Sequence, residues 1–206
     1  MFDWAVSSFK NYFSSESFVF VVRPDEFSEV FVRDSVNKLG IENYKIFQLS
    51  EDTRGQAETA YLSLLDYDAD FPITIFNIDT VRYKYKQPSF ISSCDGYLEV
   101  FRGLGDHWSF VEPGAESTVI RTTEKERISD LCSDGLYYFK SQLRFREIFE
   151  EALSANEKVR GEFYVAPLYN RLISIGGVVK YNIIDASQID FCGTPAEYEQ
   201  LLKKKR

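Results

Sequence analysis

The chain has 206 residues, of which 44% are hydrophobic and 16% aromatic, so it can bury one substantial core. We expect a single domain over residues 1–206. The formal net charge of −8 argues against nucleic-acid binding as the main activity, although a few local cations could still hold a compact anionic ligand. With His107 as the only histidine, neither a Ser-His-Asp triad nor a multi-histidine metal site can form within one chain.

The sequence also bears on location. Its start lacks the basic region and long apolar run of a signal peptide, and no stretch approaches the length that spans a bilayer. Cys94, Cys132 and Cys192 are far apart and odd in number, which is typical of reduced thiols rather than of a disulfide framework or a zinc site. We therefore expect a cytoplasmic protein with no membrane insertion.

The first half of the chain alternates helices and strands. The apolar spacing predicts, in order, helix 2–13, strand 17–22, a helix capped by Asp25 and ended by Gly40 after Leu39, strand 44–49, helix 56–65 and strand 72–76. The continuous apolar run at 17–22 suits a strand buried on both faces of a parallel sheet. This alternation predicts an α/β fold with a mixed, mainly parallel sheet flanked by helices.

The second half has more strands than helices. The predicted strands are 96–101, 108–112, 118–122, 136–139 and 178–184, and the predicted helices are 144–153, 162–175 and 195–204. The basic tail from Lys203 to Arg206 is typical of a solvated helix end, because cations favour helix C-termini.

Asp79 follows a predicted buried strand in Asn77-Ile78-Asp79. Open α/β sheets bind ligands beyond the carboxyl ends of their strands. A carboxylate there can hold Mg²⁺, which needs few protein ligands because it also binds water and phosphate oxygens. The alternative is that Asp79 only caps a turn.

Gln56 follows Gly55 at a predicted helix start. Its side-chain amide can both donate and accept, which suits the edge of a nucleobase. The alternative is ordinary helix capping by Asp52 or Thr53.

Glu124 and Lys125 form an adjacent acid and base before a short aromatic strand. Lys125 offers three donors for a phosphate, and Glu124 can accept from sugar hydroxyls. Gly135 would allow a ligand to approach the backbone closely. Read alone, the tract is also compatible with a charged turn.

Two further residues have a structural and a functional interpretation. Glu162 lies at the start of a predicted helix, where the helix dipole alone favours an acid. Trp108 could stack on a sugar ring, or it could be a core tryptophan beside a surface histidine.

Taken in chain order, seven short motifs resemble those of the sugar-phosphate nucleotidyltransferases, above all members from capsule and surface-polysaccharide gene clusters. The motifs are Gly55–Thr59, Asn77–Asp79, Trp108–Val111, Glu124–Ser129, Gly135–Phe139, Gly161–Asn170 and Gly193–Pro195. The resemblance implies a Rossmann-like GT-A fold. It also implies an enzyme that joins an NTP to a sugar 1-phosphate, or a similar small phosphate, and releases pyrophosphate.

The resemblance also implies roles for individual residues. It assigns Gln56 to the base, Asp79 to the catalytic Mg²⁺, Glu124 and Lys125 to the sugar hydroxyls and phosphate, Gly135 and Glu162 to the pocket lining, and Trp108 to substrate binding. Asp79 and Lys125 are thus the predicted catalytic residues.

Two features depart from the family pattern. Relatives begin with a strand and a glycine-rich triphosphate loop that precede the segment matched by Met1, so we expect the first strand and loop to be missing. A partner chain, homo-oligomerisation or a truncated reading frame would each account for this, and we expect truncation. Phe191 stands where several relatives carry a second metal-binding acid, with Asp190 one position earlier, so no second metal ligand is predicted.

Three functions remain open at this point. The first is a nucleotidyltransferase that is impaired by loss of the triphosphate loop. The second is a non-catalytic remnant, or a module that binds a sugar phosphate. The third is a GT-A glycosyltransferase, which would need an Asp-x-Asp pair where this chain has Asn77-Ile78-Asp79.

Overall fold

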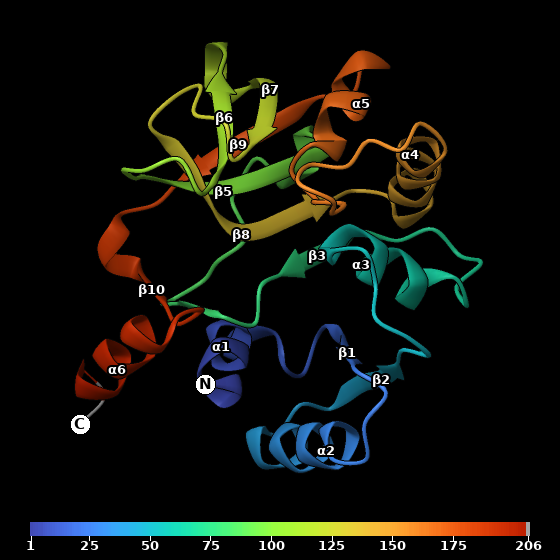
Figure 1. Ribbon diagram of the computed structural model, residues 1–206, viewed down its shortest axis with the longest axis vertical. Helices are drawn as coiled ribbons and strands as arrows, with labels where there is room; N and C mark the ends of the chain where they lie inside the picture. The colour runs from blue at the N-terminus through green and yellow to red at the C-terminus, as the bar shows by residue number, and fades with distance from the viewer. Residues whose placement is uncertain (205–206) are drawn as a thin grey trace. The chain divides into compact units, whose positions relative to one another are not determined.

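The computed structural model describes residues 1–204, and their contacts fall into two units, each described by itself below (Figure 1). The first unit comprises residues 1–53, 77–86 and those from 187 on, and the second comprises 54–76 and 87–186. The expectation of one domain over residues 1–206 stays a prediction.

The first unit contains a two-stranded parallel sheet, β1 (Ser17–Val22) and β2 (Asn43–Gln48), in register from end to end. Helix α2 (Ser28–Leu39) follows Asp25, whose carboxylate accepts from the amides of Phe27 at 2.9 Å and Ser28 at 2.6 Å. The helix ends at Gly40, which has a φ of +76°. Both predicted boundary signals are therefore confirmed, because each acts through a local hydrogen bond or dihedral angle.

The N-terminus forms helix α1 (Phe2–Val6) and then a 3₁₀ segment, Ser7–Tyr12, so the predicted continuous helix over 2–13 is wrong. The helix breaks at Phe9, which has φ −103° and ψ 18°. The Phe9 ring packs 4.9 Å from Tyr85, and the Ser8 hydroxyl accepts from the backbone amide of Arg82 at 2.9 Å. These tertiary contacts hold a geometry that apolar spacing alone does not encode.

Two short strands, β4 (Thr80–Arg82) and β10 (Ile189–Phe191), pair antiparallel in the first unit. Neither was predicted, because three residues are too few to show an alternating pattern. The closing helix α6 (Pro195–Lys204) matches its prediction. Thr194 and Glu197 cap it reciprocally, each side chain accepting from the other residue's amide. Of the basic tail, Lys205 and Arg206 lie outside the described residues.

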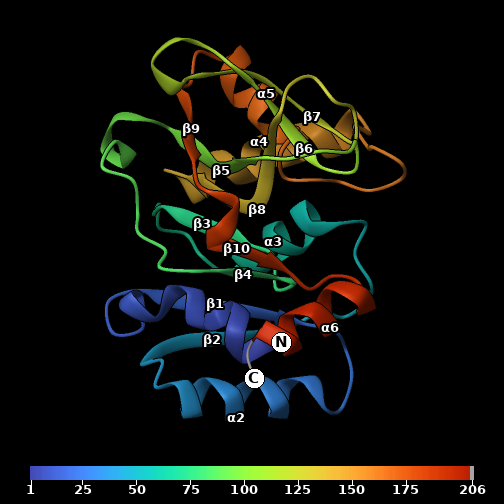
Figure 2. The same ribbon diagram turned by 90° about the vertical axis from the view of Figure 1, so that its left-hand side faces the viewer.

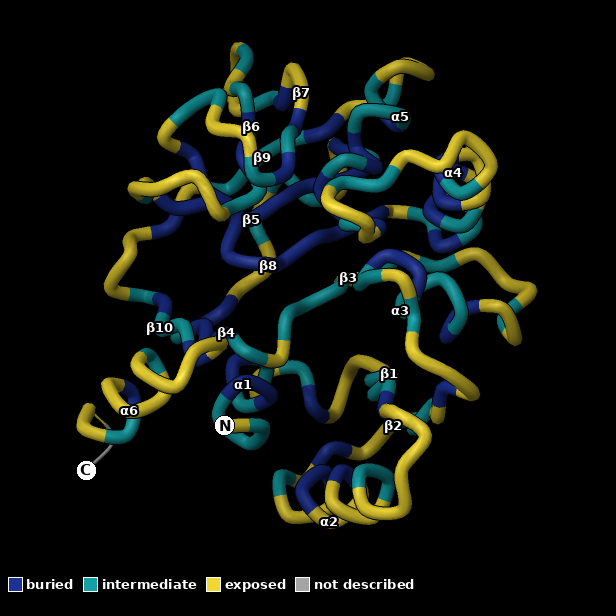
Figure 3. Tube along the Cα trace, viewed as in Figure 1, coloured by how far each residue is buried: buried dark blue, intermediate teal, exposed yellow. Residues whose placement is uncertain are grey.

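The second unit is built on a six-stranded sheet with the order β7-β6-β8-β5-β9, and β3 pairs with β8. The strands are β3 (Ile73–Phe76), β5 (Gly96–Arg102), β6 (Ser109–Pro113), β7 (Val119–Glu124), β8 (Leu131–Phe139) and β9 (Val179–Ile183). Every residue of β8 is buried, and β5 is buried up to Phe101 (Figure 3). The core of this unit therefore lies on these two central strands.

The predicted α/β class and mixed sheet are confirmed, but the predicted excess of parallel pairs is not. Within residues 1–204 only β1–β2 and β5–β9 pair in parallel, while β4–β10, β3–β8, β5–β8, β6–β7 and β6–β8 are antiparallel. No α-helix separates β5, β6, β7 and β8 along the chain. Connections without a crossover helix join antiparallel neighbours, which accounts for the difference.

Three helices pack on the sheet of the second unit: α3 (Gln56–Leu64), α4 (Gln142–Ser154) and α5 (Leu168–Ser174). Helices α3 and α4 lie side by side, with the rings of Tyr61 and Phe149 4.8 Å apart (Figures 1 and 2). None of the helices within residues 1–204 is long and apolar enough to cross a membrane.

The predicted helix over 162–175 is wrong in its first half, because α5 begins only after Pro167. The Phe163 amide donates to the Arg54 carbonyl oxygen at 2.7 Å, and its carbonyl oxygen accepts from the Ala57 amide at 3.1 Å. Both backbone groups of Phe163 are thus bonded outside its own segment, which leaves them unable to take part in a helix.

Candidate functional site

The Glu124–Lys125 pair lies where β7 ends. Glu124 is the last residue of β7 and stands opposite Ser109 of β6. The Lys125 amide then donates to the Trp108 carbonyl oxygen at 2.8 Å, and Lys125 itself has a left-handed φ of +55°. Such a backbone is strained for a residue other than glycine, and strain of this kind is often found at functional sites.

The Glu124 carboxylate is buried, with 8% of the residue exposed. It accepts a hydrogen bond from the Ser109 hydroxyl, whose oxygen lies 3.3 Å from that of Tyr137. Burial raises the pKa of Glu124, and the nearby Glu162 charge acts in the same direction. The Ser109 hydrogen bond and the Lys125 and Arg160 charges oppose that rise in pKa.

The Lys125 side chain is held by Tyr164. Its Nζ donates to the Tyr164 hydroxyl and lies 4.4 Å from the centroid of the Tyr164 ring. Both residues are partly exposed. A half-buried ammonium is thus fixed beside a buried carboxylate, which suits a ligand with both an anionic group and hydroxyls.

Glu162 and Tyr164 come from an extended segment that follows a tight turn. Val159 and Glu162 exchange both backbone hydrogen bonds, at 2.9 and 3.0 Å, across Arg160 and Gly161. Arg160 and Gly161 have φ of +49° and +90°, as a two-residue turn of this hand requires. In an extended chain, alternate residues share a face, so Glu162 and Tyr164 lie opposite the buried Phe163.

Gln56 starts α3, immediately beside this segment. Its neighbour Gly55 has a φ of +128°, and a Cβ there would lie 2.5 Å from the Phe163 carbonyl oxygen. Only glycine allows the two backbones to approach so closely. The N-cap position of α3 is Gly55, which has no side chain that could cap the helix, and capping by Asp52 or Thr53 stays an alternative.

Gly135 lies inside β8 with a φ of +90°, and its amide is 3.2 Å from the Ser133 hydroxyl oxygen. The β5–β8 register shifts between Leu98 and Val100, opposite this stretch. A bulge of this kind redirects the following side chains. Tyr137, which contacts Ser109, comes two residues later.

The Trp108 indole is engaged by its own loop. Its Nε1 donates to the Leu104 carbonyl oxygen at 2.9 Å, and its ring packs edge-on at 5.2 Å from Phe101. His107 lies 4.3 Å from the same ring. His107 is exposed, as the structural interpretation expects, but Trp108 is half-buried rather than a core residue, and sugar stacking by Trp108 stays a prediction.

The tyrosine and asparagine that close the Gly161–Asn170 motif hold the scaffold. The Asn170 side chain bonds both backbone groups of Thr122 in β7, at 2.8 and 2.9 Å. The buried Tyr169 hydroxyl lies within 2.9 Å of the carbonyl oxygens of Tyr97 and Tyr138. Asn170 therefore fixes β7 two residues before Glu124, while Tyr169 contacts β5 and β8.

Asp79 belongs to the first unit, between β3 and β4. Its carbonyl oxygen accepts from the Cys192 amide at 2.8 Å, and a Cβ on Gly193 would lie 2.8 Å from its carboxylate. Asp190, which sequence analysis noted beside the expected second ligand position, instead accepts from Tyr83 at 2.7 Å and from Lys204.

A magnesium ion fits Asp79 only as a single-carboxylate site. Within residues 1–204 no group of three His, Cys, Asp or Glu side chains could hold a metal. Gly193 leaves the Asp79 carboxylate uncovered by any Cβ on that side. Mg²⁺ tolerates this arrangement, since it takes most of its ligands from water and phosphate.

The second unit thus gathers Gln56, Glu124, Lys125, Gly135 and Glu162 on adjoining segments, with Trp108 next to Ser109. Ser109, Tyr137 and Tyr164 contact this group as well, and none of them was predicted as a site residue. All three do stand inside quoted motifs: Ser109 in Trp108–Val111, Tyr137 in Gly135–Phe139 and Tyr164 in Gly161–Asn170. Their contacts depend on tertiary structure, so no local signal singled them out.

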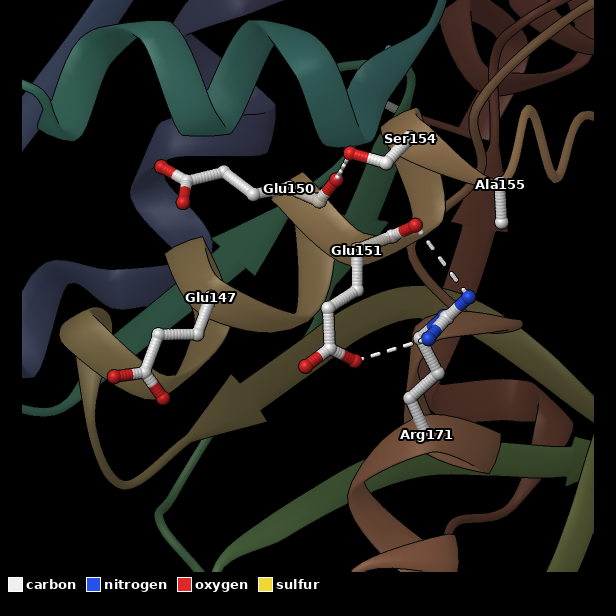
Figure 4. A pocket seen from close by; sticks show the side chains of 6 residues that line it. All are labelled: Glu147, Glu150, Glu151, Ser154, Ala155 and Arg171. Carbon is white, nitrogen blue, oxygen red and sulfur yellow. Dashed lines mark hydrogen bonds and ion pairs between the residues drawn. The ribbon is translucent and has the colours of Figure 1, made fainter.

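A separate surface pocket lies between α4 and α5 (Figure 4). It is lined by Glu147, Glu150, Glu151, Ser154, Ala155 and Arg171. Arg171 binds the Glu151 carboxylate at 2.9 Å and the Glu157 carboxylate at 2.7 Å. None of the predicted site residues lines it, and its one arginine, Arg171, is paired with Glu151 of the same lining.

No family model and no curated protein matches this chain. Among solved structures, it is similar to a nucleoside-diphosphate-sugar pyrophosphorylase from Vibrio cholerae RC9, with 44% identity, 98% of this chain and 86% of that chain covered, and a TM-score of 0.93.

Two distant structures share the fold alone. One is an inositol-1-phosphate CTP transferase from T. maritima, with 15% identity, 93% of this chain and 78% of that chain covered, and a TM-score of 0.65. The other is a CTP:phosphocholine cytidylyltransferase from Streptococcus pneumoniae, with 11% identity, 92% and 78% covered, and a TM-score of 0.66. The identity to the Vibrio protein over nearly the whole chain shows that this protein belongs to the sugar-phosphate nucleotidyltransferases, the nucleoside-diphosphate-sugar pyrophosphorylases.

Proposed function

We propose that this protein transfers a nucleotidyl group from an NTP to a sugar 1-phosphate, or a similar small phosphate, on a GT-A-like scaffold. The observation that carries the proposal is the buried Glu124 carboxylate beside the fixed Lys125 ammonium. The resemblance to capsule-cluster relatives supports a role in surface or capsular polysaccharide synthesis. A cytoplasmic location follows from the proposed substrates, and a homo-oligomer stays a prediction.

The acceptor is proposed to bind through Glu124 and Lys125. Lys125 places a positive charge against the acceptor phosphate, and Glu124 keeps lone pairs for sugar hydroxyls beyond the one that Ser109 uses. Glu162 adds a second carboxylate near Glu124. The bulge at Gly135 orients the Tyr137 side chain, whose hydroxyl oxygen lies 3.3 Å from that of Ser109.

The nucleotide is proposed to contact Gln56, whose amide can pair with a base edge from the start of α3. Asp79 would hold Mg²⁺, which supplies charge neutralisation at phosphate oxygens when bound. Trp108 is proposed to border the sugar through its position next to Ser109.

The chemistry needs no covalent enzyme intermediate. An oxygen of the acceptor phosphate attacks the α-phosphorus of the NTP, the bond from that phosphorus to its β-bridging oxygen breaks, and pyrophosphate leaves with the electron pair. The nucleophile is already an anion, so no side chain has to remove a proton. Positioning and electrostatic stabilisation supply the rate enhancement.

The test is pyrophosphate release with each of the four common NTPs against a panel of sugar 1-phosphates, inositol 1-phosphate and phosphocholine, with Mg²⁺. Turnover with at least one pair supports the proposal. Binding of a sugar phosphate by calorimetry without turnover would favour the non-catalytic module, and hydrolysis or transfer from a nucleotide sugar would favour a glycosyltransferase.

A further inference from the structure

Tyr164 has a hydroxyl group whose proton is not used by the protein. The Lys125 ammonium has only donors, so the Tyr164 oxygen is the acceptor in the bond between them. Within the described part of the chain this is the only hydrogen bond that the Tyr164 side chain makes. Its own O–H is therefore available to an external acceptor.

The Lys125 ammonium also has donors that the protein does not use. Its side chain donates one of three N–H groups to Tyr164, and no other acceptor among residues 1–204 bonds it. Two N–H groups of Lys125 and one O–H group of Tyr164 are thus free at neighbouring atoms. A cluster of donors beside a fixed positive charge is complementary to an anion with several acceptor oxygens.

The two side chains are also fixed in place. The Lys125 amide is bonded to the Trp108 carbonyl oxygen, and the Tyr164 ring lies 4.4 Å from the Lys125 ammonium. Phe163 and Val165, on either side of Tyr164, are each only 1% exposed and anchor its backbone. The donors are therefore preorganised before a ligand arrives, which favours affinity.

We propose that Lys125 and Tyr164 together form the phosphate clamp of the acceptor site, in which the Tyr164 hydroxyl donates directly to a phosphomonoester while it accepts from Lys125. This inference rests on the proposed function for the identity of the acceptor. It adds Tyr164 to the acceptor site as a residue that recognises the phosphate group and does not contact the rest of the acceptor. A ligand with hydroxyls but no phosphate gains nothing from the clamp.

The decisive variant is Tyr164→Phe, which keeps the ring against Lys125 and removes only the hydroxyl. Binding of glucose 1-phosphate and of inorganic phosphate is measured by calorimetry and by ³¹P NMR, without any need for turnover. Loss of a hydrogen bond to a charged ligand is expected to weaken the binding of both about 10-fold or more. Tyr61→Phe is the matched control, because the Tyr61 hydroxyl bonds Glu150 at 2.8 Å in the same unit and outside the site.

A double-mutant cycle with Lys125→Met separates a clamp from two independent contacts. If the two residues act together, the double variant loses less affinity than the product of the two single losses. With an active acceptor pair, Tyr164→Phe also raises the KM for the acceptor and leaves that for the NTP unchanged. A merely structural role for Tyr164 would affect both.

The outcomes for the clamp and for the proposed function are distinguishable. Wild-type binding of phosphate esters that is weakened by Tyr164→Phe, without turnover for any pair, supports the clamp and removes the enzyme. Turnover with acceptor affinity unchanged by Tyr164→Phe overturns the clamp and keeps the enzyme. Absence of phosphate binding by the wild type overturns the clamp as well.

Discussion

The Ser109 hydroxyl donates to the Glu124 carboxylate across the β6–β7 ladder, and it is the only hydrogen bond that the Glu124 side chain makes within residues 1–204. Glu124 is 8% exposed, so most of its hydration has been lost. A carboxylate in this state binds sugar hydroxyls strongly, because they replace hydrogen bonds that water no longer supplies.

Glu124→Gln is expected to stabilise the fold at neutral pH while it weakens acceptor binding. Burial raises the pKa of Glu124 above its ordinary value of 4.5, so the folded state holds the proton to higher pH than the unfolded chain does. The contribution of protonated Glu124 to the free energy of unfolding is fully present below pH 4.5. It is lost as the pH rises through the pKa of Glu124 in the folded state. The amide does not ionise and so removes this loss of stability, and urea unfolding of both proteins from pH 4 to 8 measures it.

The control for that measurement is Glu126→Gln, which changes an exposed glutamate two residues away. It should leave both the pH dependence of unfolding and acceptor binding unchanged. If the Glu124→Gln protein were less stable than the wild type at pH 7, burial would not be the dominant influence on the pKa of Glu124.

Lys125→Ala is expected to raise the KM for the acceptor phosphate by about 10- to 100-fold, because a charge-assisted hydrogen bond is lost. The KM for the NTP should change little. Steady-state kinetics with each substrate varied in turn check this, with Lys140→Ala as an exposed lysine control. An equal rise in both constants would show that Lys125 supports the fold or the nucleotide instead.

Asp79→Asn is expected to abolish Mg²⁺-dependent turnover, because the amide oxygen lacks the charge that holds the ion. A magnesium titration of the initial rate measures the effect. Asp190→Asn is the matched variant: it should keep the magnesium response and lower the free energy of unfolding, since it weakens the bonds from Tyr83 and Lys204. Wild-type activity in both Asp79→Asn and Lys125→Ala would refute the assignment of the site.

Gly55→Ala is expected to lower the free energy of unfolding by about 2–4 kcal/mol, because the added Cβ meets the Phe163 backbone in a conformation already unfavourable for alanine. Gly176→Ala measures the free-energy cost of the positive φ by itself. Gly176 also has a positive φ, +87°, but no atom lies within 4 Å of the position that its Cβ would take. Its cost should be about 1 kcal/mol. Thermal unfolding of both variants gives the comparison, and equal costs would show that the close approach to Phe163 is unimportant.

Local signals predicted much of the fold. Strand β1 and helix α6 have the expected bounds, and α2 ends at Gly40 as expected, because capping and apolar runs act over a few residues. The sequence order of the motifs likewise indicated the family. The Glu124–Lys125 tract could be singled out because an acid and a base stand together before a strand.

Only the tertiary structure decided the rest. Helical spacing over 162–175 was overridden because Phe163 bonds Arg54 and Ala57, and this extended segment is what brings Tyr164 to Lys125. The antiparallel position of β8 and the contact of Ser109 with Glu124 likewise join residues far apart in the chain. The sequence therefore determined the elements and the chemical groups, whereas long-range hydrogen bonds and burial decided which of those groups meet.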